Sequence, residues 1–388
     1  MTTTIELLQT QKNPTEKLGL YIHIPFCKKK CRYCDFFSIP VNNGVPDEYI
    51  HALLAELGDL PYKHTLKSIY IGGGTPSLLN IKQIEKIARH VNKLFKSDKP
   101  EFSIEVNPDD ITEDWVKELK GVSINRISIG VQSFFDTELQ YLGRRHDASK
   151  AKLACEIIAK HFDNWSLDLI FGIPVSTAKK WEENLSIALN LSPSHISTYN
   201  LTYEPGTPLY KNNLKEKNDD DTCLELYKIA EKYLVEKGFE HYEISNFAKQ
   251  GYKCIHNLIY WHNETYIGIG AGAFSYVGNL RCMNIPNIKE YLKFPGKKFE
   301  EDYLTKNEVK VETLIQYFRL SDGIDEKTYF ERFHSTLEND FGPALYKLTN
   351  RGLLEYNKGV YKPTNQGFYL NNEIGIELLL CIDKDNKL

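Results

Sequence analysis

The feature that most limits how this chain can fold is a regular alternation, from Leu18 onward, of short β-branched runs with amphipathic helical patterns. Such runs predict strands, and apolar residues that recur with a period of 3.6 predict helices. Successive strand–helix units predict a parallel sheet, because parallel neighbours need a crossover between them. The six predicted strands are Leu20–Ile24, Ser68–Ile71, Glu101–Val106, Arg126–Gly130, Ser166–Ile170 and His195–Asn200.

The predicted helices are Asp47–Leu57, Ile81–Leu94, Thr112–Leu119, Ala148–Lys160, Lys179–Leu191 and Thr222–Lys237. The length of 388 residues suits one large α/β domain with a smaller one, and a hydrophobic content of 41% suffices for both cores. We therefore expect an α/β fold whose larger part is a partial parallel (β/α)6 barrel. A doubly wound open sheet is the alternative.

Unusual residues fall at or just past the ends of the predicted strands. They are Cys27, Cys31 and Cys34 after the first strand, Gly72–Pro76 after the second, Glu105 at the third, Gln132 after the fourth and Asp168 within the fifth. Parallel barrels bind ligands at the carboxyl ends of their strands. We therefore expect these residues to meet at one mouth of the barrel and to form a binding site there.

The three cysteines are separated by three and then two residues, which is a spacing typical of a cluster-ligand loop. Thiolates are the usual ligands of iron–sulfur cubes, and three of them can hold three irons while the fourth iron stays open to a small molecule. A closed zinc site needs four ligands, and the nearest candidates, His23 and Asp35, are poorly placed to supply the fourth. Zinc and plain buried thiols remain the alternatives.

The stretch Tyr21–Phe36 resembles the signature of the radical S-adenosylmethionine (SAM) superfamily, in which the amino and carboxylate groups of SAM chelate the open iron. From about Leu18 to its C-terminus, the chain is similar to the branch that contains the oxygen-independent coproporphyrinogen III oxidases and the HemW-type heme chaperones. The resemblance implies a radical-SAM barrel, a 4Fe–4S cluster on the three cysteines, and bound SAM.

The resemblance also assigns residues to SAM: Tyr21, Tyr33, Gly73, Gly74, Thr75, Glu105, Gln132, Arg144 and Asp168. It implies that the glycine-rich turn and Glu105 contact the methionyl group of SAM. The last three residues would hold its carboxylate and its ribose. Arg145 is adjacent to Arg144, so the match leaves an ambiguity of one position. Without the resemblance, the glycine-rich turn would be an ordinary βα turn and Glu105 a surface carboxylate.

A second motif, His256-Asn-Leu-Ile-Tyr-Trp261, lies beyond the last predicted strand–helix unit. Taken alone, it predicts an aromatic-rich turn with a structural histidine. It resembles the His-Asn-x-x-Tyr-Trp motif of the HemW-type heme chaperones, and this resemblance implies a heme-binding role for His256. We expect His256 to lie outside the residues that contact SAM.

After Gly238 the strand–helix alternation stops and the character of the sequence changes. We divide the chain into a tail (1–17), the barrel (18–240), an aromatic-rich extension (241–304) and a C-terminal module (305–388). The module is predicted as two or three helices followed by a hairpin of Leu353–Tyr356 and Val360–Pro363, an arrangement similar to a winged helix. Residues 306–388 carry 11 Lys and Arg against 13 Asp and Glu, which opposes nucleic-acid binding.

The resemblance favours a heme chaperone that binds a cluster, SAM and heme and delivers heme to acceptor hemoproteins such as respiratory enzymes. The first alternative is a coproporphyrinogen III oxidase. Two departures count against it: the oxidases usually carry a fourth cysteine where Phe36 stands, and only about 20 residues precede Tyr21. We therefore expect no oxidase activity. The second alternative is an RNA-modifying radical-SAM enzyme, which the acidic C-terminal module disfavours.

The composition predicts a cytoplasmic protein without an integral membrane segment. No apolar run approaches the ~20 residues of a membrane span, and the polar start Met1–Lys17 lacks the apolar centre of a secretory signal. Five of the eight cysteines are scattered singly, which suits reduced thiols. Peripheral association with a membrane and a homodimer are left open.

Overall fold

The six predicted strands form a parallel sheet in chain order in the computed structural model, which describes residues 17–60, 65–95 and 99–385. They are β1 (Lys17–Ile24), β4 (Thr65–Gly73), β5 (Glu101–Val106), β6 (Arg126–Gln132), β7 (Trp165–Phe171) and β8 (His195–Asn200). Residues 1–16 of the predicted tail lie outside the described part of the chain, and Lys17 begins β1.

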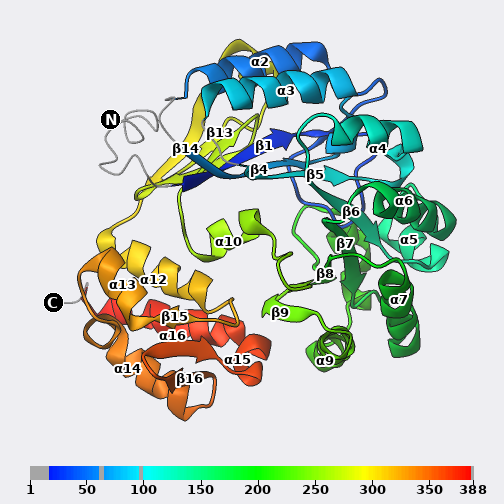
Figure 1. Ribbon diagram of the computed structural model, residues 1–388. Helices are drawn as coiled ribbons and strands as arrows, with labels where there is room; N and C mark the ends of the chain where they lie inside the picture. The colour runs from blue at the N-terminus through cyan, green and yellow to red at the C-terminus, as the bar shows by residue number, and fades with distance from the viewer. Residues whose placement is uncertain (1–16, 61–64, 96–98, 386–388) are drawn as a thin grey trace.

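The predicted helices cover the outer side of this curved sheet (Figure 1). They are α2 (Asp47–Gly58), α3 (Ile81–Leu94), α4 (Glu113–Lys120), α6 (Ala148–His161), α7 (Ala178–Asn190) and α9 (Asp220–Glu236). The order of the six strands never reverses, whereas a doubly wound sheet has a point of reversal. The sheet is therefore of the kind found in a partial barrel, and the doubly wound alternative is wrong.

The two faces of the parallel strands differ in chemistry. The face under the helices carries β-branched and aromatic residues, such as Ile104 and Ile129, that are completely buried in the main core. The opposite face carries a serine on each of five neighbouring strands: Ser68, Ser103, Ser128, Ser166 and Ser197. Bulky apolar side chains usually fill the inside of a parallel barrel. Small polar side chains in their place leave room inside this one.

Residues 241–304 extend the same sheet at both edges, so that it has 12 strands in the described part of the chain. At one edge, β10 (Asn246–Ala248) is antiparallel to β8 and is followed by β9 (Glu240–Glu243). At the other edge, β11 (Tyr266–Ile269) pairs in parallel with β1. The antiparallel strands β12 (Phe274–Val277), β13 (Leu280–Asn284) and β14 (Lys298–Tyr303) continue from there.

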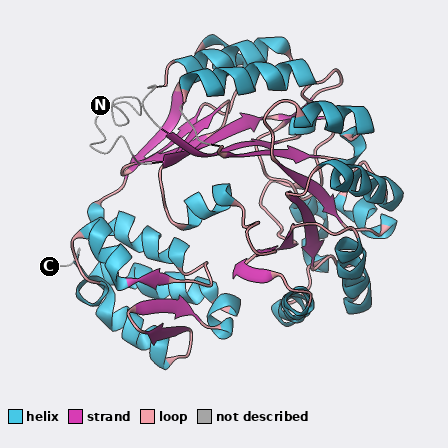
Figure 2. Ribbon diagram, viewed as in Figure 1, coloured by secondary structure: helices cyan, strands magenta, loops and turns pink. Residues whose placement is uncertain are grey.

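The C-terminal module has its own hydrophobic core and a small antiparallel sheet (Figure 2). Its helices are α12 (Lys306–Tyr317), α13 (Glu326–Phe333), α14 (Leu337–Asn350), α15 (Asn365–Tyr369) and α16 (Asn371–Asp385). Its strands are β15 (Ile324–Asp325), β16 (Leu354–Asn357) and β17 (Val360–Pro363). The predicted hairpin is present, and it turns through Lys358 and Gly359, both at positive φ (49° and 84°), as a two-residue hairpin turn requires.

The remaining short elements lie mainly in the loops. They are β2 (Phe26–Cys27), β3 (Ile39–Pro40), α5 (Asp136–Leu142), α8 (Pro208–Asn213), α10 (Ile255–Trp261) and α11 (Ile288–Lys293), with 3-10 turns at Pro76–Leu78, Pro108–Asp110 and Leu214–Glu216. Among them, α10 carries the His256 motif and lies between the barrel strands and the C-terminal module (Figure 1).

Candidate functional site

The cysteine loop begins in β2, which pairs with β3 and so holds both ends of the loop together. Cys27 is buried, whereas Cys31 and Cys34 are half-buried, and all three are free thiols. Burial raises the pKa of the Cys34 thiol to about 11. A bound metal would oppose this shift, because coordination deprotonates a thiol. The three side chains thus offer thiol donors at the carboxyl end of β1.

The glycine-rich turn after β4 packs directly against the first cysteine. The Thr75 hydroxyl donates a hydrogen bond to Cys27 Sγ at 3.3 Å. A Cβ added to Gly74 would lie 3.0 Å from Cys27 Sγ and 2.7 Å from the carbonyl oxygen of Phe26. Glycine is therefore required at position 74 by this close approach, and Thr75 is aimed at a cluster-ligand candidate rather than at solvent.

No three His, Cys, Asp or Glu side chains within residues 17–60, 65–95 and 99–385 are arranged to share one metal ion. A four-iron cube binds each thiolate to a different iron, so its ligands do not share one ion. The donor set of Cys27, Cys31 and Cys34 fits a cube by its chemistry, and the loop that carries these thiols is closed by β2 and β3.

Arg144 is the arginine that lies against the cysteine loop. Its Nη1 lies 3.5 Å from Cys31 Sγ and 3.5 Å from the Tyr33 hydroxyl oxygen, and its Nη2 donates to the carbonyl oxygen of Gly130 at 2.6 Å. Its buried Nε has no hydrogen-bond partner in the described part of the chain. Arg145 instead forms an ion pair with Asp110 at 3.2 Å. Of the two adjacent arginines, only Arg144 is directed toward the cysteines.

Glu105 at the end of β5 is held in a fixed orientation by two donors. The Tyr70 hydroxyl donates to Oε1 at 2.9 Å and the Gly73 amide to Oε2 at 3.1 Å. Gly73 has a φ of +117°, a conformation that L side chains rarely adopt. Burial raises the pKa of Glu105 to about 7, against the smaller opposing effect of the Tyr70 hydrogen bond. Glu105 therefore changes charge near neutral pH.

Asp168 and Gln132 lie on the next two strands. The Ser128 hydroxyl lies 3.3 Å from an oxygen of the Asp168 carboxylate, and burial raises the pKa of that carboxyl group. Gln132 follows an irregularity in the pairing of β6 with β7 and has a φ of +71°. Its Nε2 lies 3.0 Å from the position of a Cβ added to Gly130. Glycine at 130 thus leaves space for the Gln132 amide.

A cavity of about 300 Å³ brings several of the predicted residues together. It is lined by Tyr21, Phe36, Tyr70, Gly73, Glu105, Arg126, Ser128, Asp168, His195, Ser197, Tyr199, Cys254, His256, Asn257 and Tyr260. The lining does not include the three loop cysteines, Gly74, Thr75, Gln132 or Arg144. Tyr33 instead packs against a separate small cluster of buried residues near Leu142. Of the residues assigned to SAM, four therefore share one cavity: Tyr21, Gly73, Glu105 and Asp168.

The expectation that His256 lies apart from the SAM-binding candidates is wrong. Its ring stacks on Tyr70, with ring centres 5.0 Å apart, and on Tyr21 at 6.2 Å. Both of these tyrosines line the cavity with Glu105. The physical reason is the sheet topology: β11 pairs with β1, so the chain just before β11, which includes α10, lies beside the first strands of the barrel.

Both ring nitrogens of His256 are engaged in hydrogen bonds. Nδ1 lies 2.7 Å from Ser68 Oγ, and Nε2 lies 2.9 Å from the Tyr260 hydroxyl oxygen. Burial lowers the pKa of the ring to about 3, so His256 is neutral at physiological pH. A heme iron could bind Nε2 only after the Tyr260 contact is released.

The C-terminal end of α10 is bound by the C-terminal module. Arg332 of α13 donates to the carbonyl oxygens of His262 and Asn263 at 2.8 and 2.6 Å. The Arg319 guanidinium lies 4.3 Å from the centre of the Trp261 ring. Groups from the barrel and from the module therefore fix the two ends of this short helix.

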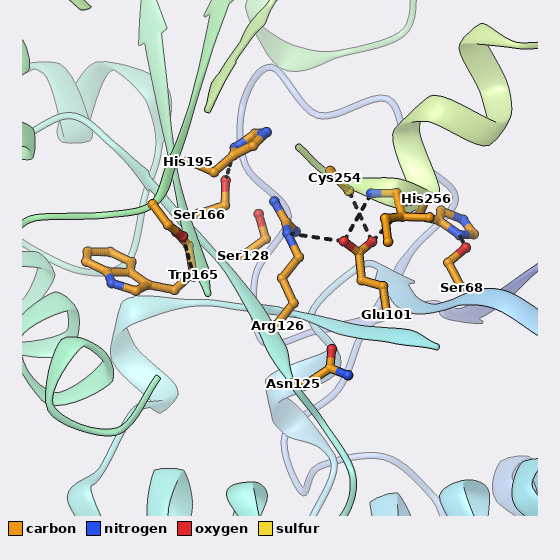
Figure 3. Close-up of polar contacts among 12 residues, drawn as sticks. Ser68, Glu101, Asn125, Arg126, Ser128, Trp165, Ser166, His195, Cys254 and His256 are labelled. Atoms are coloured by element: carbon orange, nitrogen blue, oxygen red, sulfur yellow. Dashed lines mark hydrogen bonds and ion pairs between the residues drawn. The ribbon is translucent and has the colours of Figure 1, made fainter. Parts of the chain in front are cut away.

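Two charged residues inside the barrel, Glu101 and Arg126, were missed by the sequence analysis (Figure 3). Glu101 accepts hydrogen bonds from the amides of Ile255 and His256 at 3.0 and 3.1 Å, and its Oε2 lies 4.0 Å from Arg126 Nε. The sequence did contain a signal: both strands begin with polar residues at every second position, whereas the strands of a parallel sheet are usually apolar on both faces.

The chain matches two family profiles: one described as Radical SAM superfamily over residues 21–187, and one described as HemN C-terminal domain over residues 304–370. It is 37% identical over 371 residues to the heme chaperone HemW of Bacillus subtilis. The aligned region covers 91% of this chain and 97% of that protein. The heme chaperone HemW of Lactococcus lactis is 32% identical over 367 residues, covering 93% and 97%.

The fold is similar to that of a solved structure, the coproporphyrinogen III oxidase HemN of Escherichia coli. The TM-score is 0.83 over 96% of this chain and 92% of that one, at 21% sequence identity. At this identity the likeness concerns the fold alone.

Proposed function

Since the chain belongs to the HemW heme chaperone family of the radical SAM superfamily, we propose that it binds heme and delivers it to acceptor hemoproteins such as respiratory enzymes. The observation that carries the proposal is the match to a heme chaperone over 91% of this chain and 97% of the relative. The coproporphyrinogen oxidase reading loses support at Phe36, a cavity-lining residue where the oxidases usually have a fourth cysteine.

Membership of the superfamily implies a 4Fe–4S cluster and SAM, and we propose which residues hold them. Cys27, Cys31 and Cys34 would each bind one iron of the cube. When bound, the cluster and SAM together supply one-electron chemistry at the SAM sulfonium. Arg144 Nη1 lies 3.5 Å from Cys31 Sγ, and its Nε, which has no hydrogen-bond partner in the described part of the chain, suits the SAM carboxylate.

Glu105 is proposed to accept a hydrogen bond from the methionyl amino group of SAM. Tyr70 and Gly73 already hold the carboxylate, so it needs no reorientation when the ligand arrives. Asp168, with two acceptor oxygens, suits the ribose hydroxyls. These assignments leave Arg126 and His195 outside the SAM contacts. We call the part of the cavity that these two residues line its floor.

SAM binding is expected to depend on pH through Glu105. The carboxyl group has a pKa of about 7, and its ionised form is the stronger acceptor, because a hydrogen bond to a charged group is stronger than one to a neutral group. The affinity for SAM should therefore fall as the pH drops below 7, by at most about tenfold per unit, and level off above it. Calorimetric titration of the cluster-loaded protein between pH 6 and 8.5 measures this.

The matched control is Glu105→Gln, which keeps the shape of the side chain but removes its titration. Dividing the wild-type affinity by that of the variant cancels the titration of SAM itself. If the ratio stays constant across the pH range, Glu105 does not contact the amino group of SAM.

The proposed function is tested by heme titration and heme transfer on one anaerobically reconstituted preparation. We expect the wild type to bind hemin, to pass it to an apo-hemoprotein, and to show no conversion of coproporphyrinogen III. Turnover of coproporphyrinogen III at enzyme-like rates would instead support the oxidase. The variant His256→Ala should impair heme binding, and Tyr260→Phe, which releases Nε2, should not impair it.

Two further assignments remain parts of this proposal: the division of the chain and its location. Residues 18–240 form the radical-SAM barrel, 241–304 an extension of it and 305–388 a winged-helix-like module, which the helices and the β16–β17 hairpin support. A cytoplasmic location is supported by eight cysteines that are all free. No helix in the described part of the chain is both long and apolar enough to cross a membrane.

A further inference from the structure

The floor of the cavity carries a buried positive charge. Arg126 is the first residue of β6, is 2% exposed, and lines the cavity with Ser128, His195 and Ser197. Figure 3 shows its side chain between Glu101 and the β7–β8 side of the barrel. None of the residues assigned to the cluster or to SAM uses this group.

The Nε–H group of Arg126 does not form a hydrogen bond with its nearest acid, Glu101. The distance of 4.0 Å between Arg126 Nε and Glu101 Oε2 is too long for a hydrogen bond, and Nε has no partner in residues 17–60, 65–95 and 99–385. Glu101 is already occupied by the amides of Ile255 and His256. A buried donor without a partner costs free energy, so this guanidinium is suited to an acceptor supplied from outside the chain.

A second unpaired donor lies beside Arg126. Ser103 of β5 is the register partner of Arg126, and its hydroxyl is buried without a partner in the same described ranges. His195, by contrast, is paired at both ring nitrogens: it contacts Ser166 Oγ at 2.8 Å and the Tyr242 hydroxyl oxygen at 2.8 Å. Ser103 is completely buried and is not among the lining residues, so the planar guanidinium of Arg126 is the group that meets the oxygens of a carboxylate in the cavity, with the Ser103 hydroxyl behind it.

The charges that face the floor permit an anion there. Burial raises the pKa of both Glu105 and Asp168, so these acids give up their negative charge more readily than usual. Burial lowers the pKa of His195 and of His256, so both rings are neutral. Arg126 is the only arginine or lysine in the cavity lining, and the acid that faces it is Glu101, at 4.0 Å from its Nε.

The register of the sheet separates this floor from the proposed SAM carboxylate. Tyr21 pairs with Tyr70, Tyr70 with Ser103, and Ser103 with Arg126. Arg144 Nη2 donates to the carbonyl oxygen of Gly130, which follows Arg126 by four residues on β6, roughly 13 Å along the strand. The SAM carboxylate, proposed to lie beside Arg144 and the cysteines, therefore does not reach Arg126.

We infer that Arg126, with Ser103 behind it, forms a carboxylate-binding subsite and that one propionate of heme occupies it. The inference rests on the proposed function, since it takes heme as the ligand. The rings of Tyr70, Tyr199 and Tyr260 line the cavity above the subsite and suit a flat apolar body attached to the carboxylate.

The first test compares two ligands on the unaltered protein. Hemin should bind about 10- to 150-fold more tightly than hemin dimethyl ester, which corresponds to the loss of one charge-assisted hydrogen bond. Equal affinities would refute the subsite while leaving the heme chaperone intact. If neither compound binds, the proposed function fails together with the subsite.

The second test uses variants of the same floor. Arg126→Gln should weaken hemin binding to the level of the ester and leave ester binding unchanged. Ser103→Ala, which keeps the Arg126 charge and serves if Arg126→Gln does not fold, should weaken hemin binding about 2- to 12-fold. Ser166→Ala is the matched control. It should leave hemin binding unchanged, because the Ser166 hydroxyl is already paired with His195. Unchanged hemin binding in Ser103→Ala and in a folded Arg126→Gln would overturn the inference.

SAM titrations of the same variants separate the two sources of a carboxylate. We expect SAM affinity to be unchanged in Arg126→Gln and in Ser103→Ala. If these variants lose SAM affinity and keep hemin affinity, the carboxylate at the floor belongs to SAM and the propionate assignment is wrong.

Discussion

Replacing Cys31 with alanine is expected to abolish the iron–sulfur cluster. Three thiolates and one external ligand complete a four-iron cube, so two thiolates leave two irons without a protein ligand. Arg144 Nη1, which lies 3.5 Å from Cys31 Sγ, would also lose its thiolate partner. Iron and acid-labile sulfide per chain, together with the visible absorption after anaerobic reconstitution, measure the effect.

The matched control for the cluster is Cys155→Ala. Cys155 is a completely buried thiol in the main core, so its replacement should leave iron and sulfide at the wild-type level. The cysteine-loop assignment is wrong if a variant lacking Cys27, Cys31 and Cys34 retains as much iron and sulfide as the wild type.

Replacing Glu101 with alanine is expected to lower the free energy of unfolding by about 3–5 kcal/mol. Removing one partner of a buried ion pair leaves the other charge buried and uncompensated, and here that charge is Arg126. The amides of Ile255 and His256 lose their acceptor as well. Denaturant unfolding followed by circular dichroism measures the change.

The control for this stability loss is Glu118→Ala. Glu118 is an exposed carboxylate in α4, so its replacement should change the free energy of unfolding by less than about 0.5 kcal/mol. The double variant Glu101→Ala/Arg126→Met should recover part of the loss, because it removes the unpaired charge. If Glu101→Ala and Glu118→Ala unfold alike, the ion pair does not contribute as described.

The barrel could be predicted from the sequence because its elements are defined by local patterns. Helix α6 begins at Ala148 as predicted, since the side chain of Asp147 accepts the amide of Lys150 and fixes the first turn. The end of α9 was likewise close to its prediction. Its start was placed at Thr222, whereas Asp219 caps the helix, which begins at Asp220. Local capping chemistry accounts for both results.

The location of His256 could not be predicted, because it depends on pairing between distant segments. The register of β11 against β1 joins Tyr266 to Gly19, and no local pattern encodes that contact. Glu101 and Arg126 were hidden for a related reason. They occupy the first positions of correctly predicted strands, where a charged residue is normally a solvated strand end rather than part of an interior ion pair.

The anchoring of α10 has a consequence for the order in which the protein folds. A helix of seven residues does not persist by itself in water, so α10 depends on its anchors. Those anchors, Glu101 at its beginning and Arg332 just beyond its end, come from segments more than 200 residues apart. Such non-local contacts form late, because their loop-closure entropy is lost before they contribute. A nascent chain can therefore assemble the cysteine loop early. His256 and its contacts with Tyr70 and Tyr260 become ordered only after α13 has been synthesised.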